Sequence, residues 1–274
     1  MRLKMAKKKP TLADIRANKG KYQYSKLHIE SWDEIAACEA AGIDMLSVEL
    51  RYVQDPRFRQ IAPSSWAVVG RSLYDNEGPT DDFLRFGYQA LRHGADAIYC
   101  PTSYGNIRKM ADEAIPVIGH VGLIPSKCSW TGGFKAVGRT AESAMDVWDM
   151  VRRYEDAGAF GVEIEVVPPD IAAEISRRTS LFMISMGSGT GCDAQYLFTC
   201  DVLGETRGHI PKHAKVYRQF AKEMDRLQNE RIAAFKEFHA DVQTSAFPEA
   251  TQVTQAHPGE FEKFMQLLDK SKHA

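Results

Sequence analysis

Short apolar segments alternate along the chain with longer segments whose apolar residues recur at helical spacing. The apolar segments, interpreted as strands, are KLHIE (26–30), DMLSVEL (44–50), WAVVGRSL (66–73), DAIYC (96–100), PVIGHV (116–121), FGVEIEVV (160–167), LFMISMG (181–187) and FTCDVLG (198–204). Amphipathic stretches such as SWDEIAACEAAG and TAESAMDVWDMVRRYEDAG lie between them and end on glycine, as helix C-termini often do. This alternation predicts βα units on a parallel sheet.

The number of these units bears on the architecture. Eight βα units in a chain of 274 residues favour a TIM (β/α)8 barrel. A doubly wound open sheet fits the same alternation and is the main alternative. We expect a single domain over residues 1–274, with an N-terminal extension or helix over 1–25 and a C-terminal helix and tail over 211–274.

The C-terminal segment has a helical pattern of its own. Between Pro211 and Gln243, apolar residues recur at helical spacing: Val216, Phe220, Met224 and Leu227. The pattern predicts a long amphipathic helix whose apolar stripe contacts the core or another subunit. Beyond Phe247 the chain is polar, and we expect it to extend over a neighbour or to fray.

Composition narrows the class of protein. The chain is 44% hydrophobic and 26% charged, enough for a sizeable core, and its net charge of -1 argues against a nucleic-acid surface or a polybasic membrane anchor. A basic cluster at 209–226 is interpreted as the start of a solvated helix. The five cysteines show no zinc-like or disulfide spacing, and neither a signal peptide nor an 18-residue apolar run occurs. These features predict a reduced, cytoplasmic protein.

Polar residues at the predicted strand ends nominate a site, because the C-terminal ends of barrel strands converge on one mouth. Taken in order, these residues are His28, Glu30, Glu49, Arg51, Arg71, Ser72, Cys100, Thr102, His120, Glu165, Ser188 and Asp201. The predicted mouth is therefore rich in acids, bases and cations.

Two carboxylates in EIEVVPP lie on one face of an otherwise apolar strand, at Glu163 and Glu165. Burial makes a carboxylate a stronger base, so Glu165 at the strand end is the candidate general base. Structural salt bridges are the alternative, left open for Glu163. Arg51 and Arg71 could clamp the carboxylate of a small oxo acid, with a surface ion pair as the favoured alternative for Arg51.

Two glycine-rich segments have alternative interpretations. GSGTGCDAQ (187–195) could offer amides to an anion, but it matches neither dinucleotide nor phosphate-loop spacing, and a tight turn packing a strand on a helix is favoured. The segment from Gly122 to Arg139 is longer than most βα connections. It is either a lid or binding loop, or a surface loop that contacts a neighbouring subunit through Trp130 and Phe134.

Four segments carry a resemblance to a known family: GHVGLIPSKCSWTGGFKAVGRT, IEVVPPDIAAEI, GSGTGCDAQ and CDVLGETRGHIPKHAKVY. They are similar to GHxGLTPQ…GGYKVQGR, LECVPxxLAxxI, GIGAGxxxDGQ and HDxxG…PKFxK of the ketopantoate hydroxymethyltransferase (3-methyl-2-oxobutanoate hydroxymethyltransferase) family of the phosphoenolpyruvate/pyruvate superfamily. The resemblance covers about residues 115 to 220. The N-terminal third resembles the family only loosely, through EIAACEAAGIDML.

The resemblance implies an eight-stranded barrel and a homo-oligomer, a decamer as in the family. It also implies an Mg2+ ion that chelates the 2-oxo acid and 5,10-methylenetetrahydrofolate as co-substrate, in a step like that of pantothenate biosynthesis. The family's general base falls on Glu165 and its strand-end histidine on His120.

The chain departs from the family pattern where the family binds metal. VGDS is replaced by SVELR, so that an Asp ligand falls on Leu50, or on Glu49 after a shift of one residue. ADLPF is replaced by GRSLY, with Arg71 at the second Asp, and KIEGG by YCPTS, with Tyr99 and Pro101 at its Lys and Glu. We therefore expect Mg2+ to bind poorly, with Glu49 the remaining candidate ligand, because a hard dication needs several oxygen ligands.

We expect an enzyme that forms or breaks a C–C bond on a small 2-oxo acid by hydroxymethyl transfer. Glu165 takes the α-proton, His120 orients the substrate oxygen or moves a proton, and the cation of Arg71 neutralises the substrate or its enolate. Further predicted substrate-binding residues are Glu49, Arg51, Tyr99 and Ser188. The alternatives are a lyase or one-carbon transferase of the same superfamily acting on another substrate, and an inactive oligomeric binding protein.

Overall fold

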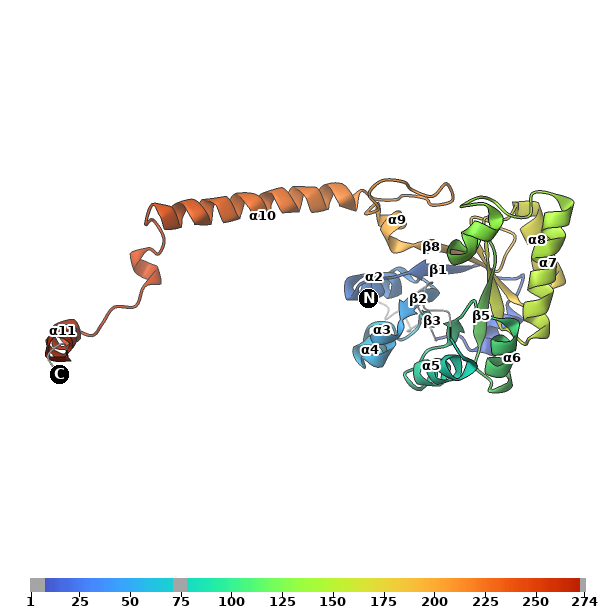
Figure 1. Ribbon diagram of the computed structural model, residues 1–274, viewed down its shortest axis with the longest axis horizontal. Coiled ribbons are helices and arrows are strands. Elements are labelled where there is room, and N and C mark those ends of the chain that lie inside the picture. Colours follow the sequence, from blue (N-terminus) through green and yellow to red (C-terminus); the bar gives the residue numbers. More distant parts are fainter. Residues whose placement is uncertain (1–7, 71–77, 272–274) are drawn as a thin grey trace, which may run out of the picture. The chain divides into compact units, whose positions relative to one another are not determined.

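A computed structural model describes residues 8–70 and 78–271. The chain divides into two compact units, Met1–Gln219 and Phe220–Ala274. Within the described part of the first unit, eight parallel strands close into a barrel in sequence order, and the last strand pairs with the first (Figure 1). The predicted TIM barrel is confirmed, and the closed ring rules out the open sheet.

The strands are short, with three to six residues each. They are β1 (Tyr24–His28), β2 (Met45–Glu49), β3 (Trp66–Gly70), β4 (Ala97–Tyr99), β5 (Val117–Gly122), β6 (Gly161–Glu165), β7 (Phe182–Met186) and β8 (Ala194–Phe198). The strand pairing brings together residues that are distant in sequence. On β1, Lys26 lies opposite Met45 of β2 on one side and opposite Tyr196 of β8 on the other.

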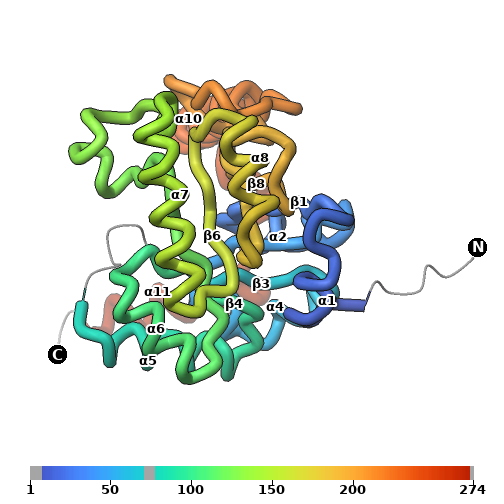
Figure 2. The backbone as a smooth tube through the Cα atoms, turned by 90° about the vertical axis from the view of Figure 1, so that its right-hand side faces the viewer, coloured from blue at the N-terminus to red at the C-terminus, as the bar shows by residue number. Residues whose placement is uncertain are grey.

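Helices cover the outside of the barrel, with α7 packed on β5 and β6 (Figure 2). In the first unit they are α1 (Leu12–Ala17), α2 (Trp32–Ala41), α3 (Leu50–Gln54), α4 (Arg57–Ile61), α5 (Thr80–Arg92), α6 (Tyr104–Asp112), the 3-10 helix η1 (Pro125–Thr131), α7 (Ala141–Asp156), α8 (Pro169–Arg178) and α9 (Thr199–Leu203). Side-chain caps begin several of them; the Ser31 hydroxyl, for example, accepts from the Glu34 amide at the start of α2.

Two apolar clusters form the core. One fills the space between the strands and the helices, where outward-facing strand residues such as Val69 and Ile98 are fully buried. The other fills the barrel interior and includes Trp66, Phe160 and Phe182, whose rings contact one another. The interior is therefore solid toward the N-terminal ends of the strands, and any cavity must lie at the opposite end.

The eighth strand was predicted at 198–204 and lies instead at Ala194–Phe198, so that prediction is wrong in position. Asp193 fixes the start of β8, because its carboxylate accepts from the Lys19 ammonium at 2.7 Å and from the Met183 amide at 2.8 Å. Residues Thr199–Leu203 form α9, which ends at Gly204 in the left-handed region (φ 71°).

The second unit contains α10 (Phe220–Gln243), η2 (Ala250–Gln252) and α11 (Glu260–Ser271). The predicted long helix exists but begins at Phe220 rather than near Pro211. The segment beyond Phe247, expected to extend over a neighbour or to fray, contains α11, whose apolar residues also recur at helical spacing: Phe261, Phe264, Met265 and Leu268. Across the described residues, no helix has the length and apolar character needed to cross a membrane.

Candidate active site

The C-terminal ends of the strands open into a cavity of about 1110 Å³. Strand residues that face the barrel axis form its floor and wall: His28, Ser47, Glu49, Gly70, Tyr99, His120, Glu163, Glu165, Met186, Tyr196 and Phe198. Such a mouth is where barrel enzymes place their chemistry. The strand ends chosen from the sequence therefore lie on the side of the barrel that carries the cavity.

His120 is held by contacts to both ring nitrogens. It is 2% exposed, and its Nδ1 lies 2.8 Å from the Tyr99 hydroxyl. Its Nε2 lies 2.8 Å from the Leu123 carbonyl oxygen and 3.1 Å from Glu165 Oε2. Because a carbonyl can only accept, Nε2 carries a proton, and the Tyr99 hydroxyl can donate to Nδ1. The Nε2 proton therefore lies between the Leu123 carbonyl and Glu165, the candidate base.

Glu165 ends β6 at a strained turn. Its side chain is buried but lines the cavity, and the next residue, Val166, has a φ of 50°, a rare conformation for a β-branched residue. The Val166 amide donates to the Met186 carbonyl at 2.9 Å, and the Val166 carbonyl accepts from the Val137 amide at 3.1 Å. Hydrogen bonds on both sides therefore hold the turn that presents Glu165.

Gly122 lies beside this turn on β5. Its φ is 83°, and a Cβ at this position would overlap the carbonyl oxygen of Glu165. The next amide, of Leu123, donates to that same oxygen at 2.9 Å. The glycine therefore allows β5 to lie close enough to β6 for His120 and Glu165 to meet.

Lys26, which the sequence analysis did not select, forms an ion pair with Glu163 inside the barrel. Its side chain has no exposed surface, and its ammonium lies 4.0 Å from the centre of the Tyr196 ring. Burial lowers the pKa of Lys26, and the Glu163 carboxylate opposes that shift. The salt-bridge alternative is confirmed for Glu163. Strand alternation, with Tyr24, Lys26 and His28 on one face, is the signal that could have identified Lys26.

Two tyrosines complete the polar floor. Burial raises the pKa values of Tyr99 and Tyr196 well above the ordinary value, and the nearby carboxylate of Glu163 adds to both shifts. Both phenols therefore stay protonated and act as hydrogen-bond donors near neutral pH. Tyr99, a predicted substrate-binding residue, lines the cavity.

The predicted residues at the end of β2 lie at the rim. Glu49 and Arg51 both line the cavity, and an ion pair of 3.0 Å joins them, with more than half of each side chain exposed. The surface ion pair expected for Arg51 is confirmed. Arg71 and Ser72 lie outside the described residues.

Ser188 was predicted to bind substrate, but it lies away from the cavity. It is fully buried, does not line the cavity, accepts from the Val167 amide and donates to the Ile164 carbonyl, each at 3.0 Å. Its hydroxyl thus fixes the end of β6 rather than facing a ligand. His28 and Asp201 line the cavity, whereas Glu30, Cys100 and Thr102 do not.

Two loops add residues to the cavity wall. The long loop after β5 contributes Phe134, Lys135 and Ala136, consistent with a binding loop. The segment 209–213 contributes His209, Pro211, Lys212 and His213. The solvated helix predicted over 209–226 therefore begins only at Phe220, and the prediction is wrong for the residues before it. A turn at Pro211, whose carbonyl accepts from the Ala214 amide at 2.9 Å, keeps the segment out of helical conformation.

The described residues do not fit a hard dication. No group of three or more His, Cys, Asp or Glu side chains in 8–70 and 78–271 is placed to hold a metal ion. One oxygen of Glu163 binds Lys26, and Glu165 contacts the His120 ring. Glu49 is paired with Arg51. The carboxylates of the mouth are thus engaged by cations and by imidazole instead of converging on one point.

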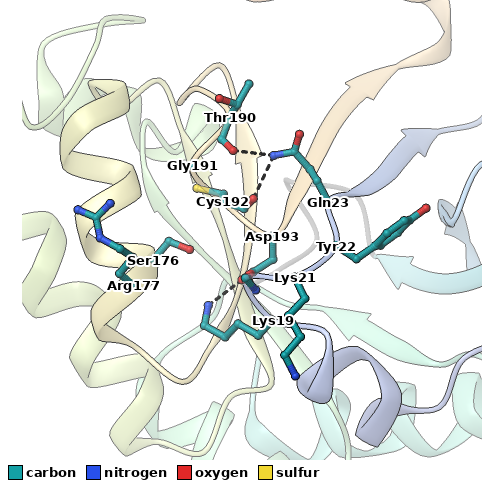
Figure 3. Close-up of a pocket in the computed structure, with 11 residues that line it drawn as sticks. Lys19, Lys21, Tyr22, Gln23, Ser176, Arg177, Thr190, Gly191, Cys192 and Asp193 are labelled. Atoms are coloured by element: carbon teal, nitrogen blue, oxygen red, sulfur yellow. Dashed lines mark hydrogen bonds and ion pairs between the residues drawn. The ribbon is translucent and has the colours of Figure 1, made fainter.

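A second hollow, of about 640 Å³, lies at the N-terminal ends of β1 and β8 (Figure 3). The Gln23 amide donates to the Thr190 and Cys192 carbonyls at 2.7 and 3.1 Å, and Asp193 binds Lys19. The Gly191 backbone lies against Ala173 of α8, which confirms the tight glycine turn. These pairings hold the barrel closed on the face that serves stability.

Comparisons with known proteins agree with this geometry. The family model for ketopantoate hydroxymethyltransferase matches residues 79–250. The 3-methyl-2-oxobutanoate hydroxymethyltransferase of Hyperthermus butylicus is 34% identical over 211 residues, 76% of this chain and 70% of the relative. The 3-methyl-2-oxobutanoate hydroxymethyltransferase 1 of Methylibium petroleiphilum is 35% identical over 167 residues, 61% of this chain and 54% of the relative.

Among solved structures, the fold is similar to that of a protein assigned as a phosphonomutase from Burkholderia cenocepacia J2315. The TM-score is 0.52 at 15% identity, covering 71% of this chain and 95% of the other. That likeness concerns the barrel alone. Against the Methylibium relative the chain spans about half of the length, whereas the match with the Hyperthermus relative is longer. On these matches, the chain belongs to the ketopantoate hydroxymethyltransferase family.

Proposed function

We propose that the chain catalyses hydroxymethyl transfer to a small 2-oxo carboxylic acid, or the reverse release of the one-carbon unit, through an enolate. The observation that carries the proposal is the contact of 3.1 Å between Glu165 Oε2 and His120 Nε2 on the floor of the cavity. A base and a polarising N–H at one point are what α-proton removal beside a carbonyl requires.

The steps follow from this pairing. Glu165 accepts the proton on the carbon next to the carbonyl, and the electron pair of that C–H bond moves toward the carbonyl oxygen. In the substrate complex, the Nε2–H of His120 leaves the Leu123 carbonyl, its partner in this structure, and donates to this oxygen, which it stabilises. The enolate carbon then forms a bond to the one-carbon unit of the donor, for which the family resemblance supports 5,10-methylenetetrahydrofolate. Both C–N bonds of that methylene carbon break, and water supplies the hydroxyl oxygen. The donor nitrogens take up the proton held by Glu165 and one from water, and tetrahydrofolate leaves.

We propose that this reaction depends less on Mg2+ than the family pattern implies. The support is the engagement of Glu163 by Lys26 and of Glu49 by Arg51, which leaves few oxygens for a dication. The resemblance also supports a homo-oligomer in the cytoplasm, and the exposed apolar residues of α10, such as Phe235, are consistent with subunit contacts.

A second candidate is a lyase or one-carbon transferase that acts on another acid. Tyr99, at the position where the family motif has lysine, lines the cavity, and its hydroxyl lies 2.8 Å from His120 Nδ1. This substitution changes the hydrogen bonding available to a substrate, which favours an altered substrate preference.

The test is solvent deuterium exchange at C3 of 2-oxo acids, the carbon next to the carbonyl, starting with 3-methyl-2-oxobutanoate and followed by NMR with and without EDTA. We expect exchange that survives EDTA and falls at least about 100-fold in Glu165→Gln, because a general base contributes that much or more. The matched control is Glu174→Gln, which changes an exposed carboxylate on α8 and should exchange like the parent.

The remaining outcomes separate the alternatives. Exchange with a different acid alone would identify the second candidate. Exchange abolished by EDTA would contradict the reduced metal dependence and restore the family's metal mechanism. Absence of exchange with every acid would contradict an enolising enzyme and favour the binding protein.

A further inference from the structure

A buried ion pair lies directly beneath the proposed catalytic residues. Lys26 extends from β1 and Glu163 from β6, and their side chains are 0% and 4% exposed. Moving both charges out of water costs about as much as their attraction returns, so a buried pair of this kind is weak evidence for stability. Its location within the site suggests a role in the chemistry.

The Glu163 carboxylate connects Lys26 to the catalytic histidine. One oxygen binds the Lys26 ammonium, and the other lies 3.8 Å from His120 Nδ1. The other ring nitrogen of His120 contacts Glu165. Four groups, Lys26, Glu163, His120 and Glu165, thus form a continuous row across the barrel.

We propose that Lys26 and Glu163 are positioning residues that set the proton occupancy of the His120–Glu165 pair. The charge of Lys26 cancels that of Glu163, so that His120 does not experience a full negative charge at Nδ1. The imidazole then remains neutral, with its proton on Nε2, and Glu165 remains free to accept the substrate proton. This role rests on the proposed function, in which Glu165 is the base.

Other groups also face this row. The titratable and charged side chains around it on the neighbouring elements include His28 of β1, Glu49 of β2, Tyr99 of β4, Tyr154 of α7, Tyr196 of β8 and Asp201 of α9. The rest of the cavity wall adds Arg51, Lys135, His209, Lys212 and His213. The tyrosines are neutral donors, Glu49 is paired with Arg51, and Asp201 accepts from the Thr206 hydroxyl at 2.7 Å. Glu163 is the carboxylate whose oxygen lies within 4 Å of His120 Nδ1. Replacing Lys26 alone would leave the charge of this carboxylate uncancelled.

The two halves of the pair should act in opposite directions. Lys26→Met leaves an uncancelled carboxylate beside His120 and favours the protonated imidazole, so the His120 titration should move to higher pH. Glu163→Gln leaves an uncancelled ammonium and should move it to lower pH. Each shift should be about one pH unit or more, as expected for a charge at this distance. The double variant removes both charges and should titrate like the parent.

The measurement is an NMR titration of the His120 ring in the full chain, with its signals assigned by their loss in His120→Gln. Lys26→Arg retains the charge and should titrate like the parent. This titration needs no turnover, so it gives a result even when no exchange activity is found. A failure of the positioning role can therefore be told apart from a failure of the proposed function. Where exchange occurs, the acid limb of its pH profile should move in the same directions.

Midpoints that stay unchanged in both single variants, or that move in the same direction, would overturn the proposal. A double variant that does not return toward the parent would do the same. If Lys26→Met does not fold, the isosteric Glu163→Gln decides alone: a downward shift supports the proposal, and an unchanged midpoint contradicts it.

Discussion

At the scale of single residues, the site depends on which groups can donate and which can accept. Leu123 offers only a carbonyl to His120, and burial keeps Tyr99 protonated, so together they fix the orientation and tautomer of the ring. The contact between His120 and Glu165 follows from that orientation. Loss of one of these partners should therefore affect both the fold and the base.

We expect Tyr99→Phe to destabilise the fold by about 1 to 3 kcal/mol, because it leaves His120 Nδ1 buried without its donor. The measurement is urea unfolding, read with deuterium exchange, which should also slow. Tyr88→Phe is the matched control: its hydroxyl binds Glu113 at a site 41% exposed, and its loss should cost within about 0.5 kcal/mol. Equal costs in the two variants would contradict the role assigned to Tyr99.

At the scale of elements, the close approach of β5 and β6 brings His120 and Glu165 together. Gly122 permits this approach, so Gly122→Ala should cost at least about 3 kcal/mol through overlap with the Glu165 carbonyl. Gly133→Ala provides the comparison, since Gly133 also has a positive φ (107°) but has no other heavy atom near its absent Cβ. Its cost should be about 1 to 2 kcal/mol, from the backbone conformation alone. Urea unfolding of both variants measures the difference, and equal values would show that the approach is not tight.

The strands and helices also show which parts of the fold and the site the sequence pattern predicts. Apolar runs located seven strands, and the strand ends selected Glu165 and His120, because alternation and the convergence of barrel strands are local and geometric rules. The eighth strand was misplaced because Thr199–Leu203 carries β-forming residues that the Gly204 cap turns into a helix. Lys26 was missed because its partner Glu163 is 137 residues away, and only the closed barrel brings β1 and β6 together.

At the scale of the whole molecule, the chain closes its barrel around titratable groups that are wholly or largely buried, so its stability should depend on pH. His28 shows this effect. Burial lowers its pKa, opposed chiefly by Glu30, and the ring packs on Phe198 with centroids 4.7 Å apart. The unfolded chain takes up a proton at this position at about pH 6.5, whereas the folded chain does so only at lower pH.

Between the lowered pKa of His28 and about pH 6.5, the unfolded state therefore binds more protons than the folded state, and stability should rise with pH. One such group contributes at most about 1.4 kcal/mol per pH unit. Urea unfolding from pH 5 to 7 should accordingly give a smaller rise in His28→Gln than in the parent, because the glutamine fills part of the space without titrating. Parallel curves would contradict the prediction, since all other groups are common to both proteins and cancel in the difference. The sign also distinguishes this site from a histidine stabilised as a cation, for which removal would steepen the rise.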